Sequence, residues 1–295
     1  MQAELIVDSK GILSEGPSWD HRKGILNWVD IEKGELHFYD PATSKEQCFS
    51  FNSRLGVGIP TDHPDKYILG LQEGIAIFDM KNTGQLDFVA DPECHLKDNR
   101  FNDGKCDPEG RLWIGSMALD VKSGAASLYR LDADFQCEKM LAKLTISNGL
   151  AWDTERNLMY FIDTADHCIY VFDYHQDDGV IMNKRIAVNI PENHGGPDGM
   201  CIDNEGMLWV AHWGGFNITR WDPLNNRMIQ MEKLPVPQPT SCAFGGEDMD
   251  ILFITTASLG LTEKEKKDYP ESGGIFKINT QVKGCRSVFF KSVKL

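Results

Sequence analysis

A short pattern that occurs six times along the chain is the feature that most constrains its fold. Each copy starts with an Asp- or Gly-containing turn and continues into a short apolar run, as in Asp107-Pro-Glu-Gly-Arg-Leu-Trp-Ile114. The sixth copy starts at Gly245. In the first five copies the turn aspartates are 42, 45, 46 and 50 residues apart: Asp20, Asp62, Asp107, Asp153 and Asp203. A fixed period of this length is typical of repeat architectures.

A second pattern follows each copy in step. It is an apolar alternation that ends in Asp or Asn, for example Leu36-His-Phe-Tyr-Asp40 and Ile169-Tyr-Val-Phe-Asp173. Alternation between turns is typical of short antiparallel strands, and a period in the forties fits one four-stranded propeller blade. We therefore predict an all-β fold, a six-bladed β-propeller with four antiparallel strands per blade, built as a single domain from residues 1–295. A two-sheet sandwich would not explain the period.

Two segments keep more than one interpretation. Either Glu4-Leu-Ile-Val7 or Ser287-Val-Phe-Phe290 could supply the outer strand that closes the last blade, and the sequence does not choose between them. The polar connection between Leu261 and Gly274 is either a lid or a solvated loop or short helix.

The charge balance bears on partners and location. The 30 basic against 44 acidic residues give a net charge of −14, which argues against nucleic acid or an anionic membrane as a partner. The first ten residues lack the pattern of a signal peptide, and no apolar run is long enough to span a bilayer. We expect a cytoplasmic protein, a monomer or weak homodimer, whose partner is a small molecule.

The eight cysteines are scattered and form no C-x-x-C pair. Four of them lie in apolar, strand-like runs: Cys106, Cys168, Cys201 and Cys242. We expect buried free thiols rather than disulfides.

Polar residues recur at one register position of the repeat. Counting five residues back from each turn aspartate, and aligning the sixth copy by its apolar run, gives Glu15, Val57, Asn102, Asn148, Asp198 and Ser241. Four of these six carry a carboxylate or an amide. Each position starts the innermost strand of its blade, so the side chains should converge on the axis at one end of the central channel.

Such polar groups are costly to desolvate unless something satisfies them, and one cation can do so. An all-oxygen ligand set suits Ca²⁺, Mg²⁺ or Mn²⁺; without His or Cys a structural zinc site is disfavoured, although a catalytic Zn²⁺ could bind. The competing interpretation is that Asp103-Gly104, Asn148-Gly149 and Asp198-Gly199 are turn residues. Four oxygen-bearing residues in register favour the metal site.

Arg100 and Asp120, on connections at the same end, are candidates to bind a polar substrate. His212 either lines the wall of the substrate site or is a surface or packing residue.

A set of short motifs in fixed order resembles the gluconolactonase/regucalcin (senescence-marker-protein) family, which includes the luciferin-regenerating enzyme. The set covers nearly the whole chain: Ser14-Glu-Gly-Pro17, Arg100-Phe-Asn-Asp-Gly-Lys105, Gly115-Ser-Met117, Ser147-Asn-Gly-Leu150, Pro197-Asp-Gly-Met200 and Leu208-Trp-Val210. The resemblance implies a six-bladed propeller with one divalent ion. The segments Leu259-Gly-Leu-Thr-Glu263 and Tyr269-Pro-Glu-Ser-Gly-Gly-Ile-Phe276 look most like the microbial sugar-lactonase branch.

Residue by residue, the resemblance implies that Glu15, Asn148 and Asp198 bind the metal directly and that Asp198 is also the catalytic proton donor or acceptor. Arg100 and Asn102 would contact substrate, with Asn102 near the ion through water. The resemblance also implies a substrate contact for Asp120. Some family members carry Glu at this point, one methylene longer, so the preferred ring and its substitution are left open.

The function predicted from these residues is metal-dependent hydrolysis of small lactones, with sugar lactones such as gluconolactone as the substrate class. The ion would polarise the carbonyl and water would attack it. Two alternatives remain: a non-catalytic calcium-binding regulator or scaffold, because propellers often serve as scaffolds, and a hydrolase of another ester or a nitrile.

Overall fold

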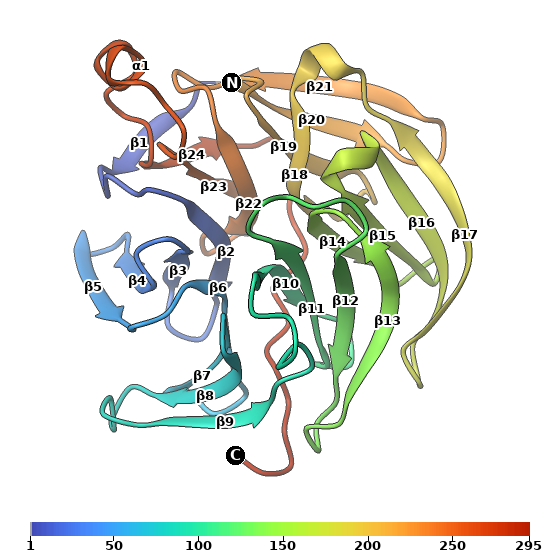
Figure 1. Ribbon diagram of the computed structural model, residues 1–295. Coiled ribbons are helices and arrows are strands. Elements are labelled where there is room, and N and C mark those ends of the chain that lie inside the picture. Colours follow the sequence, from blue (N-terminus) through green and yellow to red (C-terminus); the bar gives the residue numbers. More distant parts are fainter. Residues whose placement is uncertain (1) are drawn as a thin grey trace.

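The structure, a computed structural model, describes residues 2–295 as six four-stranded sheets arranged around a central axis (Figure 1). Neighbouring strands within every sheet are antiparallel. The predicted six-bladed β-propeller is therefore confirmed. Each sheet is one blade. The strand nearest the axis is called the inner strand here; it is the first strand of blades 1 to 5 in the chain, and residues 239–245 in blade 6.

The blades follow one another along the chain. Blades 1 to 3 consist of β2 (Ser14–Asp20), β3 (Ile25–Asp30), β4 (Glu35–Asp40) and β5 (Lys45–Ser50); β6 (Leu55–Pro60), β7 (Lys66–Leu71), β8 (Gly74–Asp79) and β9 (Leu86–Ala90); and β10 (Asn99–Cys106), β11 (Leu112–Ala118), β12 (Ala126–Leu131) and β13 (Cys137–Leu144).

Blades 4 and 5 consist of β14 (Ser147–Asp153), β15 (Leu158–Asp163), β16 (Cys168–His175) and β17 (Val180–Asn189); and β18 (Gly196–Ile202), β19 (Leu208–Trp213), β20 (Asn217–Asp222) and β21 (Arg227–Lys233). Blade 6 combines β22 (Pro239–Gly245), β23 (Ile251–Thr256) and β24 (Ile275–Asn279) with β1 (Glu4–Val7). The short helical segments are η1 (Thr164–Asp166), η2 (Glu192–His194) and α1 (Glu263–Asp268).

The amino-terminal strand closes the ring. β1 pairs antiparallel with β24, with Leu5 opposite Phe276, so the first strand of the chain becomes the outer strand of the last blade. Of the two segments that the sequence left open, residues 4–7 fill this place. The other segment instead crosses the ends of the inner strands: the Cys285 backbone N–H donates to the Ile202 carbonyl, and that of Phe290 donates to the carbonyl of Pro60.

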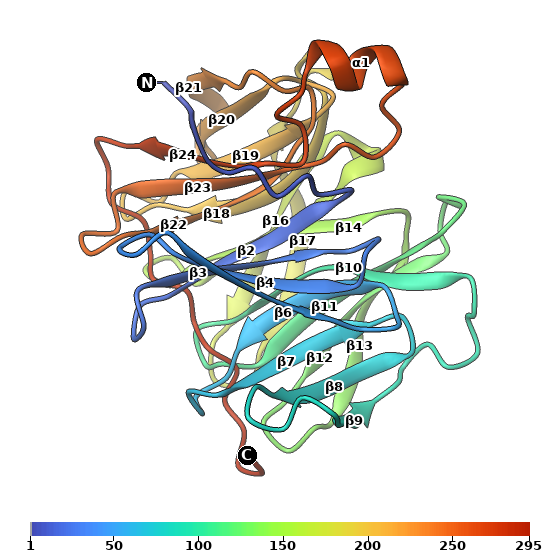
Figure 2. The same ribbon diagram turned by 90° about the vertical axis from the view of Figure 1, so that its left-hand side faces the viewer.

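The two faces of the ring thus carry different segments. Helix α1 follows the turn that contacts the start of β2, where the Ser258 backbone N–H donates to the Ile12 carbonyl, whereas the carboxyl-terminal segment lies at the opposite ends of the inner strands. Figure 2 views the ring from its side, with α1 towards one face and the carboxyl-terminal segment towards the other. The connection 261–274 is a short helix with a capping box formed by Thr262 and Glu265, one of its predicted alternatives.

The core lies between the blades. Each hydrophobic cluster combines residues from neighbouring sheets, as where Trp28 of blade 1 packs in one cluster with Phe253 of blade 6. The outermost strands are mostly exposed, and in β5 five of six residues are exposed. Apolar faces of adjacent sheets therefore bury each other, which is why the second and third strands of the blades are rich in Val, Ile, Leu and aromatic residues.

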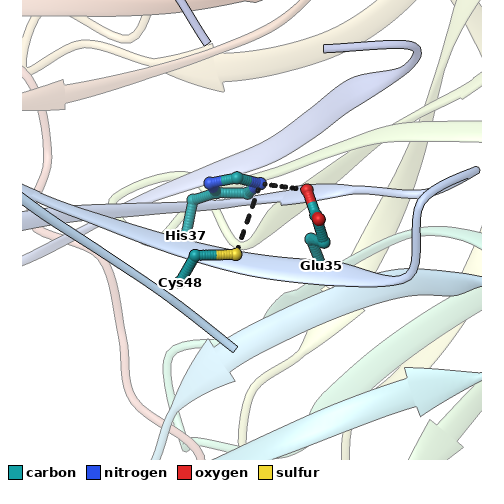
Figure 3. A group of neighbouring side chains, drawn as sticks. All are labelled: Glu35, His37 and Cys48. Atoms are coloured by element: carbon teal, nitrogen blue, oxygen red, sulfur yellow. Dashed lines mark hydrogen bonds and ion pairs between the residues drawn. The ribbon is translucent and has the colours of Figure 1, made fainter. Parts of the chain in front are cut away.

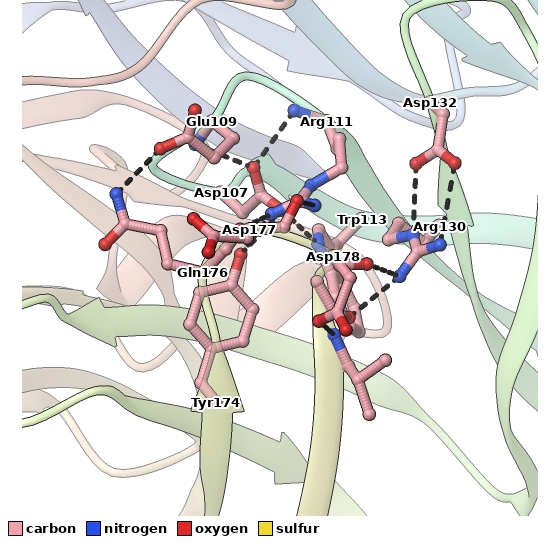
Figure 4. A network of polar contacts seen from close by, with 12 residues as sticks. Asp107, Glu109, Arg111, Trp113, Arg130, Asp132, Tyr174, Gln176, Asp177 and Asp178 are labelled. Atoms are coloured by element: carbon pink, nitrogen blue, oxygen red, sulfur yellow. Dashed lines mark hydrogen bonds and ion pairs between the residues drawn. The ribbon is translucent and has the colours of Figure 1, made fainter.

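The repeated turn aspartate closes a hairpin in several blades. In blade 3 the Asp107 carboxylate accepts hydrogen bonds from Trp113 Nε1 at 3.0 Å, Arg111 Nε at 2.6 Å and the Tyr174 hydroxyl at 2.8 Å (Figure 4). In blade 5 the same spacing lets Trp209 Nε1 donate to Asp203 at 2.9 Å. Four of the five turn aspartates are buried, and the one in blade 2, Asp62, is exposed.

The eight cysteines are all free thiols, and the four expected to be buried are buried, in agreement with the prediction. Among residues 2–295 no helix has the length and apolar character needed to cross a membrane.

Candidate metal centre

Every inner strand is irregular at the register position that was predicted to face the axis. The pairing with the second strand shifts between Glu15 and Ser18, Leu55 and Val57, Phe101 and Gly104, Ser147 and Leu150, Pro197 and Met200, and Pro239 and Ser241. A bulge re-aims side chains and is common beside functional sites. In a regular strand, side chains alternate between the two faces of the sheet. The bulge interrupts this alternation at one residue of each inner strand, at the same end of the channel in all six blades.

Four of the predicted residues form one buried cluster at this end. Glu15, Asn102, Asn148 and Asp198 are only 3–6% exposed although all are polar. The Asp198 carboxyl group lies within side-chain hydrogen-bonding reach of Asn148 and Glu15. Asn102 Nδ2 donates to Asn148 Oδ1 at 3.3 Å and to the Ser147 carbonyl at 3.0 Å. Side chains from blades 1, 3, 4 and 5 thus contact one another at the axis.

Arg100 joins the cluster from the start of β10. Its Nη1 donates to Asn102 Oδ1 at 2.7 Å and to the Phe101 carbonyl at 3.0 Å. On the other side, Arg100 Nε lies 4.0 Å from Glu32 Oε1. The guanidinium is 7% exposed, and burial lowers its pKa to about 10.

The carboxylates of the cluster are poorly compensated. Burial raises the pKa of Glu15 well above its usual range, and the negative charges of Asp198 and Asp103 raise it further. Burial and the Asp103 charge likewise raise the pKa of Asp198. Arg100 opposes both shifts and Lys105 lowers the pKa of Asp103, yet burial still leaves the pKa values of all three carboxyl groups raised. Buried like charges of this kind require protons or a cation.

The donor set fits a hard divalent cation. The Glu15 and Asp198 carboxylates and the Asn148 amide oxygen offer oxygen ligands only, the kind that Ca²⁺, Mg²⁺ and Mn²⁺ prefer. A single ion beside Glu15 and Asp198 would also offset the repulsion that raises their pKa values.

Asp103 and Thr164 belong to the cluster, and the sequence interpretation missed both. Asp103 is 5% exposed, and its charge acts on both Glu15 and Asp198. Thr164 Oγ1 accepts from Asn148 Nδ2 at 2.8 Å and donates to the Pro197 carbonyl at 2.8 Å, so it orients the asparagine. A signal for Asp103 existed, because it directly follows Asn102, but its Asp-Gly pair was read as a turn. No comparable signal marks Thr164.

The glycines that follow the predicted ligands are required by close packing at the axis. Asn148-Gly149 and Asp198-Gly199 lie inside β14 and β18, not in turns. A Cβ on Gly149 would lie 2.8 Å from the Asp198 carbonyl oxygen, and one on Gly199 would lie 2.0 Å from Ser241 Oγ. The turn interpretation is therefore wrong for these pairs, because the glycines let neighbouring inner strands approach each other.

Other candidate residues lie outside the cluster. Asp120 is exposed in the turn after β11, where its Oδ1 accepts the Lys122 backbone N–H at 3.1 Å. His212 is fully buried, and its Nε2 hydrogen-bonds Thr219 Oγ1 at 2.6 Å, so it packs inside blade 5 rather than lining a wall.

The channel continues past the cluster into a cavity of about 250 Å³. Asp103, Lys105 and Ser241 line it, together with residues 285–288 of the carboxyl-terminal segment. The buried cluster therefore lies between this cavity and the face that carries α1.

Comparison with known proteins identifies the family. A family model described as SMP-30/Gluconolactonase/LRE-like region matches residues 13–258. A Bacillus subtilis strain 168 protein provisionally named a sugar lactone lactonase is 38% identical over 290 residues, which are 98% of this chain and 99% of that protein. This chain belongs to the SMP-30/gluconolactonase/LRE-like family.

Solved structures of SMP-30/gluconolactonase/LRE-like proteins share the fold closely. A luciferin-regenerating enzyme is 32% identical with a TM-score of 0.92, over 98% of this chain and 99% of that one. A regucalcin from Agrobacterium tumefaciens, described as a calcium-binding protein, is 27% identical with a TM-score of 0.92, over 97% and 96% of the two chains. The family description and the name of the Bacillus subtilis relative support sugar lactone hydrolysis as a family-level activity, and the calcium-binding description of the regucalcin is compatible with a divalent cation.

Proposed function

We propose that this member of the family is a metal-dependent hydrolase that opens small sugar lactones such as gluconolactone. The observation that carries the proposal is the buried contact of Glu15, Asn148 and Asp198 at the axis, where two carboxylates share a site with one guanidinium nearby. The name of the Bacillus subtilis relative supports the substrate class.

Glu15, Asn148 and Asp198 hold one divalent cation in this proposal, which is Ca²⁺, Mn²⁺, Mg²⁺ or Zn²⁺. When bound, the ion supplies Lewis-acid polarisation of the lactone carbonyl and offsets charge on the developing oxyanion. Asn102 and Thr164 hold the Asn148 amide between them, so its oxygen stays directed at the site. This preorganisation lowers the cost of assembling the ligands.

Asp198 acts as the general base in the proposed reaction. It takes a proton from the attacking water and returns it to the ring oxygen that leaves when the ester bond breaks, so the products are the open hydroxy acid and no net proton is retained. Arg100 and Asn102 orient the substrate from one side of the axis. Asp120 contacts sugar hydroxyls from the rim, where its exposed position leaves it free to meet a ligand.

A pH-indicator assay with aldonolactones tests the proposal directly. Protein treated with chelator should lose activity, and addition of Mn²⁺, Zn²⁺ or Ca²⁺ should restore it to different degrees. Asp198→Ala should lower kcat by at least about 100-fold, as expected when a general base is removed, while the variant keeps the β-sheet circular dichroism of the wild type.

Three outcomes separate the alternatives in this assay. Full hydrolysis in the presence of chelator would overturn the metal-dependent proposal. Tight Ca²⁺ binding without turnover of any lactone would favour a regulatory propeller. Turnover of aryl esters or nitriles but not of lactones would keep the site and replace the substrate.

A further inference from the structure

Three potential metal ligands of different types meet on the outer half of blade 1, away from the axis. Glu35 and His37 lie on β4 and Cys48 lies on β5, and their ligand atoms are all within 4.8 Å of one another (Figure 3). It is the one cluster among residues 2–295 that brings three or more His, Cys, Asp or Glu ligand atoms together in this way. The proposed lactonase reaction uses none of its residues.

Strand geometry places the three side chains on the same face. Glu35 and His37 are two residues apart on one strand, so they project to the same side of the sheet. Cys48 is directly opposite His37 in the antiparallel pair. Directly opposed residues have their Cβ atoms about 4.5–5.5 Å apart. The arrangement is thus a property of the β4–β5 register and does not depend on a flexible loop.

The carboxylate and the thiol approach the same ring nitrogen. His37 Nε2 is 3.0 Å from Glu35 Oε2 and 3.8 Å from Cys48 Sγ, and Figure 3 shows both groups directed at this atom. In a nucleophilic triad the thiol and the carboxylate use opposite nitrogens of the imidazole. Here the Glu35 carboxylate and the Cys48 thiol both lie beside Nε2, so the three ligand atoms are close enough to bind one ion.

The imidazole is held in position from the other side. The His37 ring stacks on the buried Trp28 ring, with centroids 5.0 Å apart and planes 8° apart. Its side chain is 14% exposed and that of Glu35 is 24% exposed, while Cys48 is exposed. The ring is therefore fixed by packing, and an ion and a water molecule can reach the ligands from solvent.

We propose that Glu35, His37 and Cys48 form a second metal site that binds a zinc-class transition-metal cation, with water as a fourth ligand. A thiolate and an imidazole select Zn²⁺, Co²⁺ or Cu²⁺ over Ca²⁺ and Mg²⁺. Three mixed protein ligands and an open position match a tetrahedral Zn²⁺ site. The oxygen cluster at the axis has the opposite preference, so the two sites differ in chemistry.

Without an ion, the Cys48 thiol keeps its proton and the His37 imidazole is neutral. Burial and the Glu35 charge raise the pKa of the Cys48 thiol to about 11, so without an ion it is a weak nucleophile. Burial lowers the pKa of His37, although Glu35 and Asp30 partly oppose the shift and Lys33 reinforces it, and the neutral imidazole is the form that binds metals. An ion would displace the thiol proton on binding.

Cobalt absorption spectroscopy tests the second site. The full-length protein is first loaded with Ca²⁺ to occupy the axial oxygen cluster and is then titrated with Co²⁺ under a phosphine reductant. The wild type should show a near-ultraviolet thiolate-to-cobalt band that saturates at one equivalent. Cys48→Ser should lose the band, whereas Cys94→Ser, which removes another exposed thiol, should keep it.

Zn²⁺ competition for the bound Co²⁺ measures the affinities. Changing an outer partner of a metal ligand lowers affinity by about 10–100-fold, so Cys48→Ser and Glu35→Gln, which remove direct ligands, should each lower Zn²⁺ affinity by about 100-fold or more. Cys48 is exposed, so its serine variant should fold as the wild type does, which circular dichroism checks. Absence of the band, its survival in Cys48→Ser, or equal loss in Cys94→Ser would overturn the proposal. None of these readouts depends on lactone hydrolysis.

Discussion

At the scale of single residues, burial decides what the polar side chains of this protein can do. Glu15 and Asp198 are functional candidates because they are buried together with few opposing charges. His212 is buried too, but its partner is the neutral Thr219 hydroxyl, so it contributes to packing. The two kinds of residue looked alike in the sequence, because the sequence does not show which groups a buried polar side chain contacts.

The buried histidine makes stability depend on pH. Burial, reinforced by the nearby His194, lowers the pKa of His212 from 6.5 to about 3. Between these values the unfolded chain binds a proton that the folded protein does not, so the free energy of unfolding falls as the pH falls through this window. From pH 7 to pH 5 the wild type should lose about 2 kcal/mol of unfolding free energy through His212, and the His212→Gln variant should not. The difference in stability between the two proteins should therefore become smaller by this amount at pH 5.

Urea titrations at the two pH values measure this difference. His95→Gln changes an exposed histidine and serves as the matched control, whose pH profile should overlay that of the wild type. Parallel profiles for wild type and His212→Gln would show that the buried imidazole does not titrate as expected.

At the scale of elements, the blade hairpins are held by the turn aspartates, and the inner strands are bent by their bulges. The aspartate repeat was visible in the sequence because it combines a regular spacing with the apolar run that follows each turn, as after Asp107. The bulges were not visible, because an extra residue in one strand leaves the apolar alternation almost unchanged. They nevertheless aim Asn102 and its equivalents at the axis.

Asp107→Asn should destabilise the protein by about 3 kcal/mol, since breaking one partner of a buried ion pair leaves the others unpaired. The Asp107 side chain is fully buried, and its donors come from β11 and from Tyr174 in blade 4, so the loss affects two blades. Urea unfolding measures the change. Asp40→Asn in an exposed turn is the control and should leave the midpoint nearly unchanged; an equally small effect at Asp107 would contradict the role of these turns.

At the scale of the whole molecule, the two chain ends hold the ring together in different ways. β1 completes blade 6, while the last residues run across the inner strands at the other face. Phe290 is fully buried in the cluster formed by blades 2 and 3, and Thr61 forms a parallel bridge to it. The carboxyl-terminal segment therefore connects blades and lines the axial cavity.

Phe290→Ala should lower the free energy of unfolding by about 3–5 kcal/mol, the cost of removing a buried aromatic side chain. Val293, which is 81% exposed, provides the control, and Val293→Ala should have little effect. Thermal or urea unfolding distinguishes the two. Similar small losses in both variants would mean that the carboxyl-terminal segment is not part of the core.

The sequence by itself determined the number of blades, the order of strands and the register position of the polar residues that meet at the axis. It could do so because each blade is a contiguous segment of about 45 residues whose hairpins pair locally, so period and alternation report them directly. Only the tertiary structure decided which terminus closes blade 6, that Asp103 joins the axial carboxylates, and that Glu35 and His37 meet Cys48. The closing strand depends on which of two similar segments packs best against blade 6, and the two side-chain clusters depend on contacts between separate strands. Local residue patterns do not encode these long-range contacts.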